Sequence, residues 1–192
     1  AVTIARIAEN AGLAALAVHG RTRACAFTGE VEYDTIAAVV EAVDIPVFAN
    51  GDIDSPARAA EVVKHTGAAG VMIGRAAQGR PWLCGQVAAY LDTGEIPADP
   101  DAAGRAAILR RHVTGLHEFY GDVMGPRIAR KHVAWYLASS PAYLALKKRF
   151  NTLQTPAEQL DYIDALHSHK NDIQAGFLHQ NFLNENKEDI AA

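Results

Sequence analysis

The chain has 192 residues, of which 49% are hydrophobic and 21% are charged, and its formal net charge is −4 at pH 7. This composition is ordinary for a soluble globular protein with one α/β domain and a small appendage. We see no apolar stretch long enough to span a membrane and no basic-then-apolar leader, so neither a membrane protein nor a secreted one is indicated. Two cysteines far apart in the chain, Cys25 and Cys84, favour a reducing compartment, and we expect the cytoplasm.

The charge is distributed unevenly along the chain. Residues 105–150 contain nine Lys or Arg and two acids, a local net charge of +7, whereas the remainder carries −11. A basic segment on an acidic chain is a candidate surface for a polyanion such as RNA. A solvated helical face would give the same pattern, and charge alone does not separate the two interpretations.

Residues 45–75 predict a strand–helix–strand unit. Two short apolar runs, residues 45–49 and 70–73, flank a segment that begins at Ser55-Pro56 and ends at Gly67. A hydroxyl residue followed by proline is typical of a helix start, and glycine of a helix end. Uninterrupted apolar runs of this length are typical of parallel strands, whose carboxyl ends meet at one edge of the sheet.

Upstream, the pattern predicts a helix over residues 2–10, a strand over 13–18, a long loop over 23–33 and a helix over 34–43. Strand starts near residues 14, 46 and 70 repeat at the spacing of a (β/α) unit, and a further helix is expected over residues 76–91. Three units do not close a barrel, which needs eight. The fold is therefore either a small open sheet or the last part of a TIM barrel.

The turn-rich segment 93–100 marks a boundary, beyond which the chain is predicted to be helical. We expect helices over residues 101–120, 127–138, 141–150 and 155–167, with a capping box at Thr155 and Glu158. The helix at 127–138 brings Arg127, Arg130 and Lys131 onto one face. The tail after residue 168 is not assigned.

Polar residues follow each of the three predicted strands. His19 ends the first, Asn50-Gly51-Asp52 follow the second, and Gly74-Arg75 follow the third. Backbone N–H groups where a strand leads into a helix suit a phosphate, and in barrels the loops after the last two strands often form such a site. Each pair alone is also a common turn, but three adjacent strand ends with polar groups favour a ligand.

The sequence gives less support to two other kinds of site, a reactive cysteine and a metal site. Cys25 lies beside Arg21 and Arg23, which could lower its pKa, yet a small filler residue fits it better than a nucleophile. The eight histidines show no Cys/His spacing that fits a metal site, so no metal is expected.

Five motifs occur in register over about 130 positions. They are His19-Gly20-Arg21-Thr22, Ala49-Asn50-Gly51-Asp52-Ile53, Ile73-Gly74-Arg75-Ala76, Gly79-Arg80-Pro81-Trp82 and Arg127-Ile128-Ala129-Arg130-Lys131-His132. Through these motifs residues 1–168 closely resemble the bacterial flavin-dependent tRNA-dihydrouridine synthases, with the B-type branch nearest.

The resemblance implies a TIM barrel that binds FMN, followed by a small helical domain that grips tRNA. It implies that residues 1–92 are the last three barrel units, 93–100 a linker, 101–168 the tRNA-binding domain and 169–192 an unassigned tail. The residues implied to contact FMN are His19, Asn50, Gly51, Asp52, Gly74 and Arg75, with the last two at its phosphate. Those implied to face the tRNA backbone, where cations gain affinity by releasing counterions, are Arg127, Arg130 and Lys131.

The implied reaction reduces the C5=C6 bond of a tRNA uridine, with NADPH reducing the flavin, FMN passing hydride to C6 and a cysteine protonating C5. The base must leave its stack to reach the flavin. The proton-donating cysteine of the family belongs to the first five strands, which this sequence lacks, and Cys25 lies outside the family motif. The sequence therefore resembles the C-terminal part of a monomeric enzyme, and we expect the isolated chain to lack activity, bind FMN weakly and aggregate.

Two alternatives stay open. One is another FMN or phosphate-binding TIM-barrel enzyme that does not act on tRNA, which the basic helical extension argues against. The other is a non-catalytic tRNA-binding module, for which the strand-end residues would be dispensable.

Overall fold

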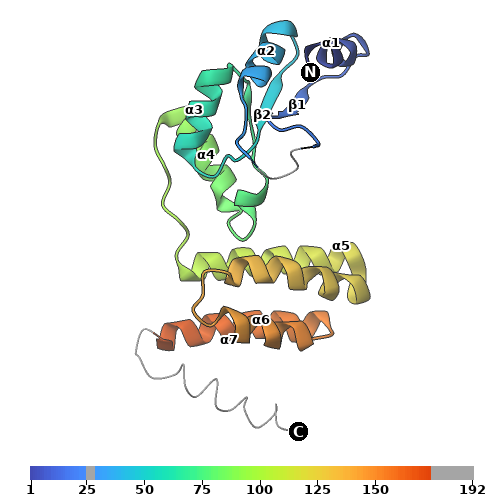
Figure 1. Ribbon diagram of the computed structural model, residues 1–192. Coiled ribbons are helices and arrows are strands. Elements are labelled where there is room, and N and C mark those ends of the chain that lie inside the picture. Colours follow the sequence, from blue (N-terminus) through green and yellow to red (C-terminus); the bar gives the residue numbers. More distant parts are fainter. Residues whose placement is uncertain (25–28, 174–192) are drawn as a thin grey trace. The chain divides into compact units, whose positions relative to one another are not determined.

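The computed structural model describes residues 1–24 and 29–173, with side chains described up to residue 166 (Figure 1). Cys25 and the tail from residue 174 lie outside the described residues. The chain forms two compact units, Ala1–Asp99 and Pro100–Ala192.

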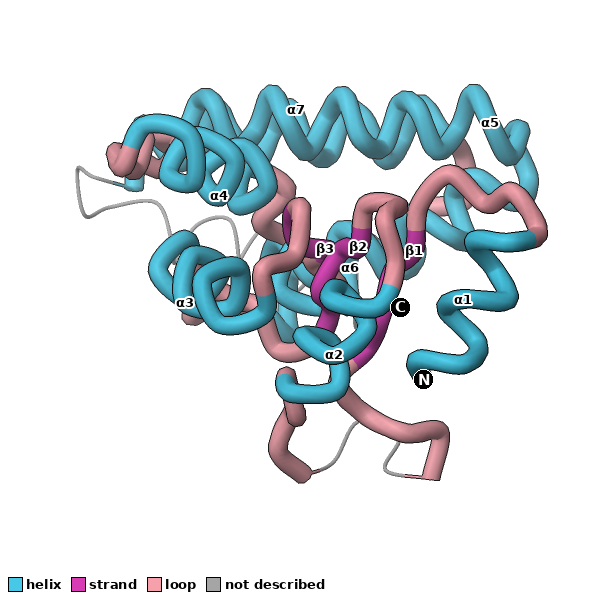
Figure 2. Tube along the Cα trace, turned by 90° about the horizontal axis from the view of Figure 1, so that it is seen from above, coloured by secondary structure: helices cyan, strands magenta, loops and turns pink. Residues whose placement is uncertain are grey.

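The first unit is built on a parallel three-stranded sheet in the order β1-β2-β3. Its elements are α1 (Val2–Asn10), β1 (Leu16–His19), α2 (Asp34–Ala42), β2 (Val47–Asn50), α3 (Pro56–Thr66), β3 (Gly70–Met72), the 3₁₀ turn η1 (Arg75–Ala77) and α4 (Trp82–Thr93). The register pairs Ala17 with Phe48 and Phe48 with Gly70. Figure 2 shows the strands beside one another, each followed in the chain by a helix.

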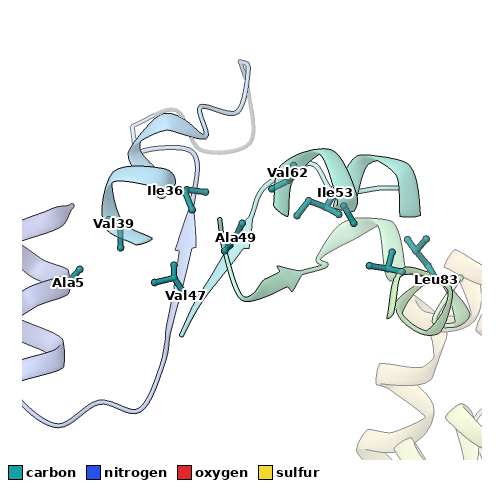
Figure 3. Packing of buried hydrophobic residues seen from close by; sticks show 11 residues of the cluster. Ala5, Ile36, Val39, Val47, Ala49, Ile53, Val62 and Leu83 are labelled. Atoms are coloured by element: carbon teal, nitrogen blue, oxygen red, sulfur yellow. The ribbon is translucent and has the colours of Figure 1, made fainter. Parts of the chain in front are cut away.

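One face of this sheet is packed. Val47 and Ala49 point into a core that also contains Ile36, Val62 and Leu83 from the helices (Figure 3). Alternation along the strands places hydrophobic side chains on both faces, as expected for parallel strands.

The opposite face of the sheet is exposed. Phe48 is 37% exposed and Met72 is 49% exposed, and helix α1 likewise exposes Ile4 and Ile7 at 72% and 62%. Phe48 and Met72 share one face of the sheet, and exposed apolar side chains gathered on one surface are unusual on a soluble domain. These surfaces have the composition of a protein interior.

The local helix signals are confirmed. Ser55 caps α3 by accepting a hydrogen bond from the Arg58 N–H at 3.3 Å, and Gly67 ends the helix in the left-handed conformation. The single helix expected over residues 76–91 is wrong in its first part, because Gly79 has a φ of 73° and Pro81 follows. A residue before proline avoids helical geometry, so α4 begins only at Trp82.

The second unit is helical, with α5 (Ala102–Leu137), α6 (Tyr143–Thr152) and α7 (Pro156–Ile173). Helix α5 is two arms separated at Gly121, whose φ of 74° reverses the chain within one residue. The break expected over residues 121–126 is therefore shorter than predicted. The arms pack side by side, since Tyr136 contacts His112 and Gly125 lies against His117.

The core of the second unit joins all three helices. It contains Leu109, Val113, Ala129, Val133, Phe150, Tyr162 and Ile163. Asp101 caps α5 by accepting from the Gly104 N–H at 2.7 Å. The capping box at α7 is confirmed, because the Thr155 N–H donates to Glu158 Oε2 at 3.0 Å and the Glu158 N–H donates to Thr155 Oγ1 at 3.3 Å.

Candidate functional site

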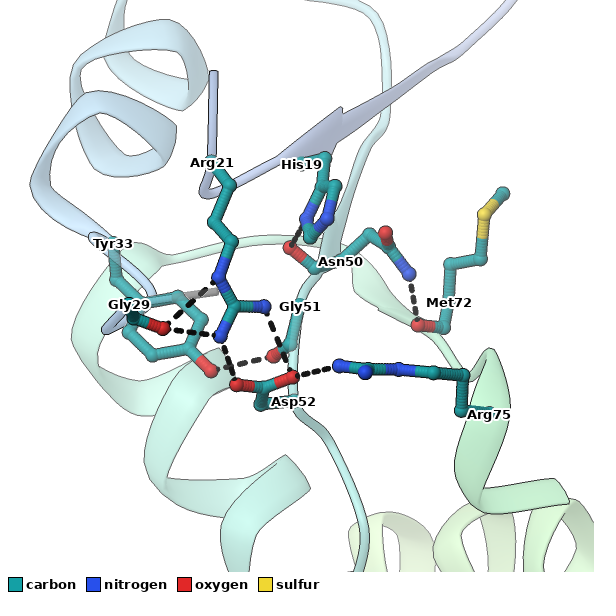
Figure 4. Close-up of polar contacts among 9 residues, drawn as sticks. All are labelled: His19, Arg21, Gly29, Tyr33, Asn50, Gly51, Asp52, Met72 and Arg75. Carbon is teal, nitrogen blue, oxygen red and sulfur yellow. Dashed lines mark hydrogen bonds and ion pairs between the residues drawn. The ribbon is translucent and has the colours of Figure 1, made fainter. Parts of the chain in front are cut away.

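The ends of the three strands bring polar groups together at one edge of the sheet. His19, Asn50 and Met72 occupy one row, because β1 pairs His19 with Asn50 and β2 pairs Asn50 with Met72. The Asn50 side-chain amide donates to the Met72 carbonyl oxygen at 2.7 Å (Figure 4). The adjacency expected from the strand order is therefore present.

One ring nitrogen of His19 has a defined partner in this arrangement. Its Nδ1 lies 3.1 Å from the Asn50 carbonyl oxygen. A carbonyl oxygen only accepts hydrogen bonds, so Nδ1 carries a proton and Nε2 is the nitrogen that faces a ligand. The exposed ring can form a hydrogen bond with a ligand at the open edge.

Asp52 joins two arginines from different strand ends. Its carboxylate forms an ion pair with Arg21, including a contact from Nη1 to Oδ1 of 3.0 Å, and a second ion pair with Arg75 at 2.8 Å (Figure 4). The hydrogen bond from Arg21 lowers the pKa of Asp52 below its ordinary value, and the charges of Arg21 and Arg75 lower it further against the opposing effect of burial. The residue is therefore a carboxylate at neutral pH.

The two arginines are held differently. The Arg21 side chain is only 4% exposed, and it also donates to the Gly29 carbonyl oxygen, from Nε at 3.1 Å and from Nη2 at 2.6 Å. The Arg75 side chain is 57% exposed. Arg21 thus fastens the loop after β1 to the end of β2, whereas Arg75 presents its guanidinium to solvent.

Gly51 is required by its surroundings. It is buried with a φ of 133°, and an added Cβ would lie 2.7 Å from Val31 Cγ1 and 3.1 Å from His19 Nδ1. The Tyr33 hydroxyl donates to its carbonyl oxygen at 2.7 Å. Its role visible here is to let the loop after β1 approach the end of β2 closely.

Gly74 differs from Gly51, because an added Cβ would meet no atom within 4 Å. The space beside its backbone is open, and it adjoins Arg75 at the start of η1. An open backbone next to an exposed guanidinium suits an anionic group. His19, Asn50, Gly51, Asp52, Gly74 and Arg75 thus all lie at the carboxyl ends of the strands or directly after them.

Sequence reasoning missed two residues of this arrangement, Arg21 and Tyr33. Arg21 was named only as part of the His19-Gly20-Arg21-Thr22 motif and for its effect on Cys25, without a role in this site. A signal was present, because an arginine two residues past one strand end faces an aspartate two residues past the neighbouring one. In a parallel pair such residues are brought into reach of each other.

The basic residues of the second unit are not equivalent. Arg127 and Lys131 are exposed. Arg130 is half-buried, and its Nη2 donates to the Leu153 carbonyl oxygen at 3.0 Å and to Gln154 Oε1 at 3.2 Å. Arg130 therefore holds the connection between α6 and α7.

The part of the chain that the structure describes contains no group of three or more His, Cys, Asp or Glu side chains able to hold a metal ion. It also contains no helix that is both long and apolar enough to cross a membrane.

Comparison with known proteins identifies relatives. A family model described as "Dihydrouridine synthase (Dus)" matches residues 1–172. The chain is 53% identical over 169 residues to tRNA-dihydrouridine synthase B of Pseudomonas putida. This alignment covers 88% of the chain and 50% of that protein. It is 57% identical over 154 residues to the protein of the same name from Pseudomonas aeruginosa, covering 80% of the chain and 46% of that protein. It is also 50% identical over 163 residues to tRNA-dihydrouridine synthase B of Vibrio cholerae, and this alignment covers 85% of the chain and 51% of that protein. The chain spans about half the length of the curated relatives it matches.

Proposed function

The chain belongs to the dihydrouridine synthase family, and from this premise we propose that it is the C-terminal part of an FMN-dependent, NADPH-linked tRNA-dihydrouridine synthase of the B type. The reaction is reduction of the C5=C6 bond of a tRNA uridine. The observation that carries the proposal is the row of strand ends, where His19, Asn50 and Arg75 meet at one edge of a parallel sheet.

The residues present fit the phosphate end of FMN. The exposed guanidinium of Arg75 supplies charge, and the open space at Gly74 admits a phosphate oxygen close to the backbone. Asp52 acts by orienting Arg75, since a carboxylate would itself repel a phosphate. FMN supplies the hydride chemistry when bound. His19 and Asn50 line the same edge and orient the flavin, and Gly51 keeps that edge compact.

We propose that residues 1–92 are the last three (β/α) units of a TIM barrel, that 93–100 form a linker and that 101–168 form a tRNA-binding domain. The exposed sheet face supports this assignment, because Phe48 and Met72 have the character of barrel-interior side chains. Five further strands, carrying the catalytic cysteine, would complete that interior.

The tRNA substrate is assigned to the basic helical unit. Arg127 and Lys131 are exposed and are proposed to bind the phosphate backbone, where each bound phosphate releases counterions. Arg130 is proposed to contribute on the same face while it holds the α6–α7 connection.

Nucleoside analysis of tRNA tests the function. Cells lacking the gene should lose dihydrouridine from at least one tRNA position, and the wild-type gene should restore it. The Arg75→Ala protein should restore less and should retain less flavin on purification. Lys64→Ala, which removes an exposed cation from the last turn of α3, is the matched control. Unchanged tRNA in the deletion strain would refute the assignment.

A further inference from the structure

Four aromatic side chains on the two arms of α5 form one connected group, here called the ring cluster: His112, His132, Trp135 and Tyr136. The centroids of His112 and His132 are 4.9 Å apart, those of His132 and Trp135 are 4.8 Å apart, and those of His112 and Tyr136 are 5.9 Å apart. All three contacts are edge-to-face. His112 Nδ1 also lies 3.2 Å from the Tyr136 hydroxyl.

The ring cluster is not the core of the unit. Its four members are half-buried, whereas the fully buried side chains nearby are aliphatic, namely Val113, Ala129 and Val133. Tyr136 packs partly against that core and anchors the group. Four aromatic rings are therefore held in fixed mutual geometry at the boundary between core and solvent.

The imidazoles of the ring cluster are neutral at physiological pH. Burial lowers the pKa of His112, and burial together with the charges of His112 and Lys131 lowers the pKa of His132. Neutral rings stack on bases without the cost of desolvating a charge.

Positive charge adjoins the rings. Lys131 Nζ lies 5.2 Å from the centroid of the Trp135 ring, a cation–π contact. Arg127 precedes Lys131 by one helical turn and is exposed. Residues 127, 131 and 135 follow the four-residue spacing of one helical face, so cations and an indole share one stripe.

We propose that this stripe binds an unpaired nucleotide of tRNA, with the base stacked on Trp135, whose ring His132 supports edge-to-face, and the adjoining phosphate bound by Lys131. Sequence-tolerant recognition of RNA commonly combines an aromatic platform with a cation for the backbone, and unpaired bases are the ones free to stack. In the free protein Lys131 holds the indole in place, and it moves to the phosphate when the base arrives. The inference rests on the proposed tRNA substrate and adds the way in which the helical unit grips it.

Salt dependence separates the two contacts. We expect Trp135→Leu to weaken tRNA binding about tenfold at every salt concentration without changing the slope of log K against log salt, because stacking releases no counterions. Lys131→Ala should lower that slope by about 0.7 to 0.9, the value of one phosphate contact. Trp135→Phe should recover most of the affinity. Phe119→Leu, which alters an 81% exposed ring elsewhere on α5, should have no effect.

Fluorescence gives an independent measurement. Tryptophan occurs only at positions 82 and 135. In the Trp82→Phe chain, tRNA should quench the remaining emission, because a stacked base quenches indole. Far-UV circular dichroism confirms that each variant is folded.

The outcomes distinguish this inference from the function it rests on. Salt-sensitive tRNA binding that is unaffected by Trp135→Leu, or no quenching in Trp82→Phe at saturating tRNA, overturns the stacking site and leaves the tRNA substrate standing. Absence of tRNA binding by the wild-type chain overturns both.

Discussion

At the scale of single residues, Asp52 organises the candidate site. Its carboxylate is the shared partner of a buried arginine and an exposed one, and it adopts a positive φ of 43° that few non-glycine residues accept. Because the Arg21 side chain is 4% exposed, its charge depends on Asp52 for compensation. The same carboxylate aims the guanidinium of Arg75.

We expect Asp52→Asn to lower the free energy of unfolding by about 1–2 kcal/mol, because the hydrogen bonds of Arg21 lose their charged acceptor. Glu61→Gln, in an exposed pair with Arg58, should change it by about 0.5 kcal/mol or less. Urea unfolding of both variants measures the difference. Equal effects would show that the ion pair with Arg21 is no stronger than a surface pair.

The stabilisation by the ion pair of Asp52 with Arg21 should depend on pH. The folded state lowers the pKa of Asp52 below its ordinary value of 3.8, so the unfolded chain binds this proton more readily. The stabilisation is therefore fully present above about pH 5 and is lost as the pH falls through the folded pKa. The wild-type advantage over Asp52→Asn should shrink below pH 4 in urea titrations, and an advantage that grew with acid would contradict the ion-pair explanation.

At the scale of elements, the two arms of α5 are joined by close backbone approach and by one buried glutamine. An added Cβ at Gly125 would lie 2.8 Å from His117 Cα and 3.1 Å from the Leu116 carbonyl oxygen on the other arm. Gln159 from α7 is fully buried, where its Nε2 donates to the Pro126 carbonyl oxygen at 3.0 Å and its Oε1 lies 2.9 Å from His117 Nε2. Three helical segments thus meet at one point.

Two glycine substitutions on α5 should have opposite effects on the stability of the helical unit. Gly125→Ala should destabilise the helical unit by about 2 kcal/mol, since its Cβ meets backbone of the opposite arm that cannot move aside. Gly115→Ala should stabilise it by about 0.5–1 kcal/mol, because its Cβ meets nothing within 4 Å and alanine favours the helix. Thermal unfolding of the two variants provides the comparison. The same sign for both would contradict the close packing of the arms.

Gln159→Leu should cost about 2–3 kcal/mol, because it leaves His117 Nε2 buried without its partner and removes the second hydrogen bond to the Pro126 carbonyl oxygen. Gln78→Leu, at an exposed position, should be nearly neutral. Chemical denaturation followed by far-UV circular dichroism reports both. A neutral Gln159→Leu would mean that the unit relaxes to hydrate these groups.

At the scale of the whole molecule, the first unit exposes apolar side chains on two of its surfaces. The exposed face of the sheet carries Phe48 and Met72, and α1 carries Ile4 and Ile7. A sheet with open edges and an apolar face is prone to associate. We therefore expect the isolated chain to self-associate and to copurify with substoichiometric flavin.

Light scattering against concentration tests this expectation. The double variant Ile4→Lys, Ile7→Lys should associate less than the wild type, because it removes apolar area from α1. Leu144→Lys, at a 77% exposed position on α6, is the control and should change little. A monomeric wild-type chain with one flavin per chain would contradict the expectation.

Local features of this protein were predictable from sequence. The caps at Ser55 and Thr155 depend on residues within one helical turn, and both were found where the sequence placed them. The adjacency of His19 and Asn50 was also predictable, because parallel neighbouring strands bring their carboxyl ends to one edge. The roles proposed for these residues stay predictions.

Tertiary structure decided what depends on contacts between distant segments. The ion pair of Arg21 with Asp52 joins residues 31 positions apart in the chain. The half-burial of Arg130 depends on its contact with the Leu153 carbonyl oxygen at the end of α6. Helical spacing alone placed Arg127, Arg130 and Lys131 on one face, without showing which guanidinium turns inward. Sequence by itself determined where α3 and α7 begin and which strand ends meet, since the first follows from capping within one helical turn and the second from the parallel order of neighbouring strands. Only the folded packing determined which charges are exposed to a ligand and which are used to hold the fold, because that depends on which neighbours desolvate each side chain.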